Sequence, residues 1–109
     1  MSVRKLLTCV VPCYNSAAYM ERAVDSLLAG GEEMEILIVD DGSTDETGAI
    51  ADRLEKEHPS VIRVRHQENR GHGSALNYGI ANAEAGHVIN CVAKPSHFVA
   101  ALNFYVFSF

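Results

Sequence analysis

Two adjacent carboxylates, Asp40 and Asp41, end the apolar run of the stretch ILIVDDGSTDETG, residues 36–48. Two anions side by side repel each other, so the pair costs stability unless a cation or a hydrogen-bonding ligand lies nearby. In an extended strand the two side chains point to opposite sides, so one can accept from a ring nitrogen while the other meets a hydroxyl or helps to orient a metal ion. A helix cap beginning at Ser43 explains only the later part of the stretch. The pattern therefore favours a binding site.

The segment VVPCYNS, residues 10–16, has side chains suited to a nucleotide. Pro12 fixes the backbone where a strand ends, and Tyr14 offers a flat face for a base or sugar ring. Asn15 offers both a donor and an acceptor. The structural alternative is that Asn15 caps the following helix while Tyr14 packs over the sheet edge, and the segment by itself favours that alternative.

The segment NRGHGSALN, residues 69–77, combines two glycines with two basic side chains. Gly71 and Gly73 permit close approach of the backbone, and the helix that follows presents free amides. Arg70 and His72 add positive charge for a diphosphate. The structural alternative is a flexible surface loop. The segment follows a third strand rather than a first one, so it is no dinucleotide fingerprint, and the chain contains no P-loop.

The order of elements explains how these segments meet. Apolar runs predict strands over 6–11, 36–39, 61–64 and 87–92. Helical periods predict a first helix that is capped by Asn15 or Ser16 and ends at Gly30, and a third helix from Ser74 to Ala83. The second helix is predicted from Ser43 to Glu57, with Glu46 completing a capping box. Strands joined by such helices run parallel with right-handed crossovers, which predicts a three-layer αβα fold with a mainly parallel sheet. Ligands bind beyond the carboxyl ends of such strands, where all three polar segments lie.

Composition sets the remaining limits. The 109 residues form one globular domain at most, and the net charge of −5 argues against nucleic acid as a partner. Cys9, Cys13 and Cys91 are odd in number and fit no zinc spacing, which predicts buried thiols in a reducing compartment, the cytoplasm. The histidines show no metal-site spacing either, and no apolar run is long enough to span a bilayer.

Three stretches together, VVPCYNSAAYMERAVDSLL, EILIVDDGSTDETGAIADRL and ENRGHGSALNYGIANAEAGHVI, closely resemble the start of family 2 glycosyltransferases, which use nucleotide sugars and have a GT-A fold. The resemblance implies that residues 1–92 are the Rossmann-like nucleotide-binding half of a GT-A domain, and that the donor is a nucleotide diphosphate sugar, usually UDP-linked. The matching positions are the segment lining the nucleotide (Pro12, Tyr14, Asn15), the acidic residue that meets the base with its neighbour (Asp41, Asp40), and the loop and helix start near the phosphates (Asn69, Arg70, Gly73).

The chain departs from the family pattern after the fourth strand. There the family has a D-x-D motif that ligates Mg²⁺ or Mn²⁺. The aligned positions, 92–95, contain no carboxylate, Lys94 stands where a metal ligand is expected, and no Asp or Glu follows Glu84. We therefore predict no metal site and assign no catalytic residue. The acceptor half with its general base is also absent, so we expect a truncated glycosyltransferase, weakly active or inactive alone.

Residues 93–109 form a divergent aromatic tail. Three interpretations remain open: a closing strand that packs on the sheet, a surface for a homodimer, or a contact with a membrane surface. The last is disfavoured because neither lysine nor arginine follows Lys94. The alternative to an enzyme is then a non-catalytic module that binds nucleotide or dimerises.

Overall fold

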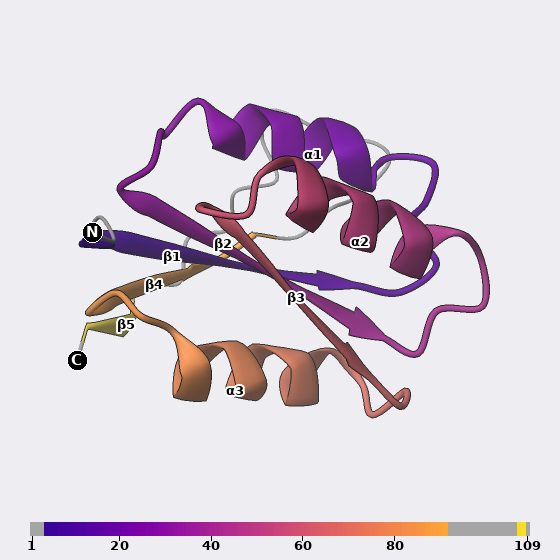
Figure 1. Cartoon of the computed structure of the whole chain (residues 1–109). Helices are drawn as coiled ribbons and strands as arrows, with labels where there is room; N and C mark the ends of the chain where they lie inside the picture. Colours follow the sequence, from indigo (N-terminus) through magenta and orange to yellow (C-terminus); the bar gives the residue numbers. More distant parts are fainter. Residues whose placement is uncertain (1–3, 92–106, 109) are drawn as a thin grey trace.

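A five-stranded sheet with strand order β3-β2-β1-β4-β5 organises the computed structural model, which describes residues 4–91 and 107–108. The elements are β1 (Leu7–Cys13), α1 (Met20–Leu28), β2 (Met34–Asp41), α2 (Thr47–Glu57), β3 (Ile62–Gln67), α3 (His72–Asn82), β4 (His87–Asn90) and β5 (Phe107–Ser108). The first four strands are parallel, and β5 is antiparallel to β4. Figure 1 shows α1 and α2 on one face of the sheet and α3 on the other. The predicted three-layer fold is confirmed.

Two apolar cores lie on the two faces of the sheet. Successive residues of β1 and β2 alternate between the two cores. Cys9 belongs to the core under α1 and α2, and Val10 belongs to the core under α3. A strand covered on both faces has no solvent side, which explains why β2 reads as a continuous apolar run. Its residues Ile36, Leu37 and Ile38 are each 2% exposed or less.

The register of the parallel strands brings their carboxyl ends to one edge. β1 pairs with β2 from Leu7↔Met34 to Cys13↔Asp40, and β2 pairs with β3 up to Asp41↔Gln67. The arrowheads of β1, β2 and β3 and the beginning of α3 lie together at this edge in Figure 1. The loops that follow the three strands therefore start side by side.

The prediction that the first strand ends at Pro12 was wrong. Pro12 pairs with Val39, and β1 continues to Cys13. The amide of Cys91 donates to the carbonyl of Val10, so the backbone groups of Val10 face β4. Pro12 lies two residues further along the strand, so its backbone faces the same side. Pro12 lies beyond Val10↔Asn90, the last described β1–β4 pair. Its missing N–H therefore removes no bond to β2.

The predicted helix starts were also wrong. α1 begins at Met20, α2 begins at Thr47 without the Ser43–Glu46 capping box, and α3 begins at His72 rather than at Ser74. The physical reason for the first two is that the side chains of Asn15 and Ser43 bond across to each other's loops instead of to their own helices.

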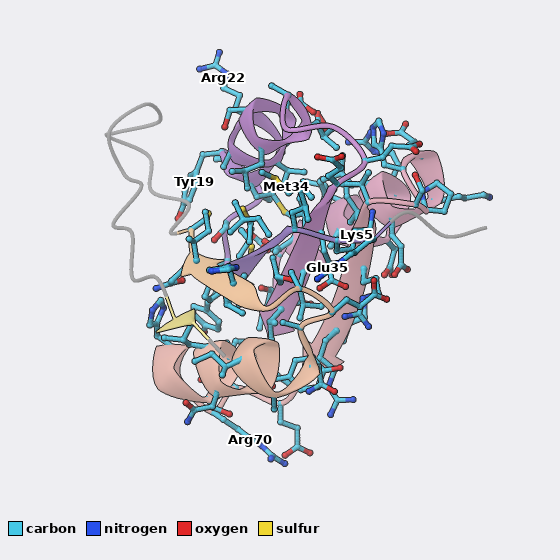
Figure 2. The ribbon with its side chains drawn as sticks, turned by 90° about the vertical axis from the view of Figure 1, so that its left-hand side faces the viewer. Lys5, Tyr19, Arg22, Met34, Glu35 and Arg70 are labelled. Carbon is cyan, nitrogen blue, oxygen red and sulfur yellow. The ribbon has the colours of Figure 1, made fainter. Side chains whose placement is uncertain are left out.

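The edge at the amino ends of the strands is held by a buried carboxylate. Glu35 is 1% exposed, and it accepts from Thr8 Oγ1 at 2.8 Å, from the amide of Glu84 at 2.9 Å and from Arg63 Nε at 2.6 Å. Beside it Lys5 Nζ donates to the carbonyl of Met34 (Figure 2). These bonds compensate the desolvation of the charge and tie three strands and the α3–β4 loop together.

The tail prediction falls mainly on residues 92–106, outside the described part of the chain. The structure describes only β5 of this tail, which pairs His87↔Ser108 and Val88↔Phe107. The domain boundary near residue 92 and the homodimer through the tail remain predictions. Among the described residues, no helix is long and apolar enough to cross a membrane.

We predict that Gly79→Ala destabilises the protein. Gly79 is buried in α3, and a Cβ there would collide with both γ-methyl groups of Val10 in β1. We expect the free energy of unfolding in urea to fall by about 1–3 kcal/mol, because the helix must move away from the sheet.

The matched control is Gly73→Ala in the same helix, where an added Cβ meets nothing within 4 Å. This variant should be neutral or more stable by up to about 1 kcal/mol. Equal stability of the two variants would show that α3 does not depend on close contact at Gly79.

Candidate functional site

A hollow of about 80 Å³ opens at the carboxyl edge of the sheet. It lies between the end of β1, the end of β2 and the beginning of α3, and the residues that line it are Pro12, Cys13, Tyr14, Asp41 and His72. The structure therefore brings together three of the eight predicted site residues, Pro12, Tyr14 and Asp41. The predicted Gly73 is the chain neighbour of another lining residue, His72.

Tyr14 provides the aromatic surface of the hollow. It follows directly after β1, and 49% of its surface is exposed, which is unusual for a large ring next to a core strand. A Tyr that packs over the sheet edge would be largely covered, so the exposed ring favours the ligand-binding interpretation over the structural one. An exposed aromatic face is suited to stacking against a base.

Cys13 also lines the hollow, and its side chain belongs to the core on the α1 and α2 face of the sheet. Burial, together with the nearby charges of Asp40 and Asp45, raises its pKa to about 12. The thiol therefore stays protonated at neutral pH and is no nucleophile. The predicted burial is confirmed for all three cysteines, and each is free.

Asp41 is the acidic centre of the hollow, and it is 5% exposed. Its Oδ1 accepts from Gln67 Nε2 at 2.9 Å and from the amide of Arg70 at 2.8 Å, and its Oδ2 accepts from the amide of Gly71 at 2.9 Å. Burial by itself would raise the pKa of this carboxyl, but these bonds and the nearby His72 outweigh it and hold the pKa below its usual value. A carboxylate has about four acceptor positions, so Oδ2 can accept one further bond.

Asp40 points to the other side of the sheet, as the strand pattern predicts. Its Oδ1 accepts from the amide of Ser43 at 3.1 Å, and its Oδ2 lies 2.9 Å from His66 Nδ1. The other ring nitrogen of His66 lies 2.7 Å from Asp52 in α2. Protein groups therefore relieve the repulsion between the two carboxylates, a role that the sequence assigned to a ligand. Asp40 does not line the hollow and supports it from behind.

Asn15 joins the first two loops. It has a φ of 49°, and its Oδ1 accepts from the amides of Thr44 and Asp45 at 2.8 and 3.3 Å. In return, its own amide donates to Ser43 Oγ at 3.0 Å. The side-chain oxygen and the backbone amide of Asn15 are thus bound to the loop after β2, and the residue positions its neighbour Tyr14 instead of lining the hollow.

The predicted phosphate loop contributes mainly through its backbone. The amide of Arg70 is bound to Asp41, whereas its side chain is exposed and points away from the fold in Figure 2. The backbone of Asn69 packs so closely on Gly42 that a Cβ there would lie 2.6 Å from the Asn69 nitrogen. Gly73 lies in the first turn of α3 with open space beside it.

Cys13, which lines the hollow, and Gln67 were missing from the predicted site residues. His72, which the sequence analysis considered only as a positive charge for a diphosphate, lines the hollow at the beginning of α3. Gln67 holds Asp41, and only the pairing of β2 with β3 reveals it. Among residues 4–91 and 107–108, no group of three His, Cys, Asp or Glu could hold a metal ion. Positions 92–95 lie outside these residues, so we assign no metal ligand.

We predict that His66 makes stability depend on pH. Its hydrogen bonds with Asp40 and then Asp52 raise its pKa above the ordinary value of 6.5, although partial burial opposes the shift. A raised pKa in the folded state gives stability that is fully present below about pH 6.5 and is lost as the pH rises through the folded value. The urea midpoint of the unaltered chain should exceed that of His66→Gln at about pH 5.5, and the difference should shrink toward about pH 8.5.

The control is His58→Gln, since the described contacts of His58 are through its backbone at the end of α2. Its difference from the unaltered chain should not follow this trend. A gap between the unaltered chain and His66→Gln that stays constant with pH would contradict the prediction.

Comparisons with known proteins identify the family. The model of the family "Glycosyl transferase family 2" matches residues 8–91. An uncharacterized glycosyltransferase of Rickettsia bellii (strain RML369-C) is 48% identical over 80 residues, which cover 71% of this chain and 11% of that protein. Glycosyltransferase GlyG of Streptococcus pneumoniae serotype 4 is 40% identical over 86 residues, which cover 77% and 28%.

Solved structures show the same architecture. Mannosyltransferase PcManGT from Pyrobaculum calidifontis, in complex with GDP-Man and Mn²⁺, has a TM-score of 0.71 and 28% identity, covering 83% of this chain and 28% of its own. S. aureus TarS 1-349, in complex with UDP-GlcNAc, has a TM-score of 0.69 and 30% identity, covering 80% and 26%. The chain thus spans 28% or less of these relatives' lengths. It belongs to glycosyltransferase family 2, and its described part has the GT-A fold.

Proposed function

We propose that the hollow binds the nucleoside of a nucleotide diphosphate sugar, and that the chain is the donor-binding part of an enzyme that transfers the sugar to a hydroxyl acceptor. The observation that carries the proposal is the meeting of Asp41 and Tyr14 at one hollow: a buried, ionised carboxylate with one free acceptor position beside an exposed aromatic ring. A planar base with a ring N–H can stack on such a ring and donate to such a carboxylate.

We further propose uridine as the nucleoside. A carboxylate accepts hydrogen bonds and cannot donate them, so it favours a base whose ring nitrogen carries a proton. Uracil and guanine have such an N–H beside a carbonyl, whereas the corresponding ring nitrogens of cytosine and adenine are acceptors. The TarS and PcManGT complexes hold UDP-GlcNAc and GDP-Man, respectively, which are nucleotides of these two bases. The small hollow favours the pyrimidine of the two.

The loop after β3 carries candidate donors for a diphosphate, with its backbone bound to Asp41 and the side chain of Arg70 extending into solvent. The exposed guanidinium of Arg70 and the free amides of the first turn of α3, around Gly73, are adjacent in the chain. Because the net charge is −5, an anion must be held by such local donors rather than by a general positive field. We propose that this loop contacts the phosphates.

Sugar transfer requires more than donor binding. The acceptor oxygen must form a bond to the anomeric carbon as the bond from that carbon to the nucleoside diphosphate breaks, and a base must take the acceptor proton. No Asp or Glu follows Glu84 to serve as that base or as a metal ligand. We therefore propose that the 109-residue chain alone binds its donor without measurable transfer. Its free, buried cysteines support a reducing, cytoplasmic location.

The first test is Tyr14→Ala, measured by calorimetry with UDP. Loss of a stacking ring should weaken binding by about 5- to 100-fold. Tyr14→Phe should retain most of the affinity, because the aromatic face is kept. Failure of UDP, GDP and their sugars to bind the unaltered chain would refute the proposal.

Leu6→Ala is the matched control for Tyr14→Ala. Leu6 is also a large, exposed side chain, at 53%, and it lies before β1 at the opposite edge of the sheet. Its removal should leave UDP affinity unchanged. Equal losses in Leu6→Ala and Tyr14→Ala would show that the effect does not arise in the hollow.

The second test is Asp41→Asn, which should weaken both UDP binding and the fold. The amide NH₂ would face the amides of Arg70 or Gly71, so we expect a stability loss of about 1–3 kcal/mol. Calorimetry without urea, at a temperature where the variant is fully folded, separates the loss of UDP affinity from the loss of stability. Gln67→Ala removes a partner of Asp41 but keeps its charge, so this control should lose stability and retain UDP affinity. Unchanged affinity in Asp41→Asn would contradict the assignment.

A further inference from the structure

A buried hydroxyl, that of Thr47, connects the first turn of α2 with the loop between β1 and α1. Thr47 is fully buried, and its Oγ1 accepts from the backbone amide of Ser16 at 2.8 Å. The same hydroxyl donates to Oδ1 of Asp45 at 2.5 Å. The other carboxylate oxygen of Asp45 accepts from the amide of Ala17 at 3.2 Å. Thr47 and Asp45 thus hold two consecutive amides of the loop, and the proposed function gives neither residue a role.

The charge of Asp45 fixes the direction of these bonds. The hydroxyl of Thr47, opposed by burial and assisted by the amides of Thr47 and Ala17, holds the pKa of Asp45 below its usual value. A carboxylate only accepts hydrogen bonds, so the hydroxyl proton of Thr47 points to Asp45 and a lone pair of Oγ1 faces the amide of Ser16. Since a buried amide without an acceptor is costly, Ser16 is held in one position.

Ser16 connects this arrangement to Tyr14. Ser16 is 3% exposed, and its Oγ donates to the backbone carbonyl of Tyr14 at 3.2 Å. Within residues 4–91 and 107–108, no hydrogen bond holds the side chain of Tyr14. The position of its ring beside the hollow therefore depends on its backbone, which Thr47 holds through Ser16.

Burial distinguishes this connection from the one through Asn15 and Ser43. Those two residues join the same loops at exposed positions, where water can replace a lost hydrogen bond. Water does not reach Thr47. We propose that Thr47 is a positioning residue for nucleotide binding, which holds the ring of Tyr14 where it stacks on the base. This inference rests on the proposed function.

The test is Thr47→Val, measured by calorimetry with UDP on the full chain, without urea. Valine has nearly the shape of threonine but no hydroxyl, so UDP affinity should fall about 3- to 10-fold, the effect of one hydrogen bond. Thr47→Ser keeps the hydroxyl and should retain most of the affinity. Ser16→Ala breaks the bond to the carbonyl of Tyr14 and should weaken UDP binding in the same range. This second variant tests the inference even if Thr47→Val does not fold.

A double-variant cycle separates positioning of the ring from a general structural effect. If Thr47 acts through Tyr14, adding Thr47→Val to Tyr14→Ala should change UDP affinity by less than about twofold. The urea midpoint should still fall in the double variant, because the buried amide of Ser16 loses its acceptor in either background.

Thr8→Val is the matched control. Thr8 is also fully buried, its hydroxyl donates to Glu35, and its Oγ1 accepts from the amide of Ala85, but these bonds lie at the opposite edge of the sheet. This variant should lose stability and keep its UDP affinity.

Three results would overturn the inference while leaving the proposed function intact. The first is unchanged UDP affinity in Thr47→Val, or in Ser16→Ala if Thr47→Val does not fold. The second is a loss on adding Thr47→Val to Tyr14→Ala that equals its loss in the unaltered chain. The third is an equal loss of UDP affinity in Thr8→Val. If the unaltered chain binds no UDP at all, the inference and the proposed function both fail.

Discussion

The buried carboxylate of Asp41 is the interaction on which the candidate site depends. A negative charge that is 5% exposed is stable only if hydrogen bonds replace the water it has lost. The backbone amides of Arg70 and Gly71 and the side chain of Gln67 supply those bonds. The same bonds fix the loop between β3 and α3 against the end of β2. Asp41 therefore holds the backbone just before α3 and leaves one acceptor position at the hollow.

The neighbouring loops are fixed in a related way, by side chains that bond to the loop of another strand. Asn15 holds the loop after β2 through its side-chain oxygen, and Ser43 holds the amide of Asn15. Behind the sheet, His66 connects Asp40 to α2 through Asp52. Three loops that start side by side are thus joined by short polar contacts. Such a rim holds Tyr14 and Asp41 in place, and under the proposed function this preorganisation lowers the ordering cost of binding.

Sequence reasoning succeeded for the sheet and failed at the loop ends for one physical reason. The strands and their parallel order follow from local apolar runs and from the length of the connections, so β2 and the two-faced core were predictable. The caps were not, because a Ser or Asn side chain bonds equally well to its own helix or to a foreign loop. Asn15 and Ser43 each bond to the loop that follows the other strand, because the fold brings these two loops close together. Pro12 was misjudged similarly, since its tolerance in β1 depends on which side of the strand its nitrogen faces.

By itself the sequence determined the layer order, the edge where the polar segments meet, and the opposite directions of Asp40 and Asp41. All of these follow from periodicity along a single chain. The tertiary structure alone decided which polar groups satisfy one another. It showed that Asp41 is held by Gln67, that the side-chain oxygen of Asn15 is bound to the loop after β2, and that the hydroxyl of Thr47 accepts from the amide of Ser16. Hydrogen bonds between residues far apart in sequence depend on which residues the register of three strands places side by side, and that pairing is a property of the folded sheet.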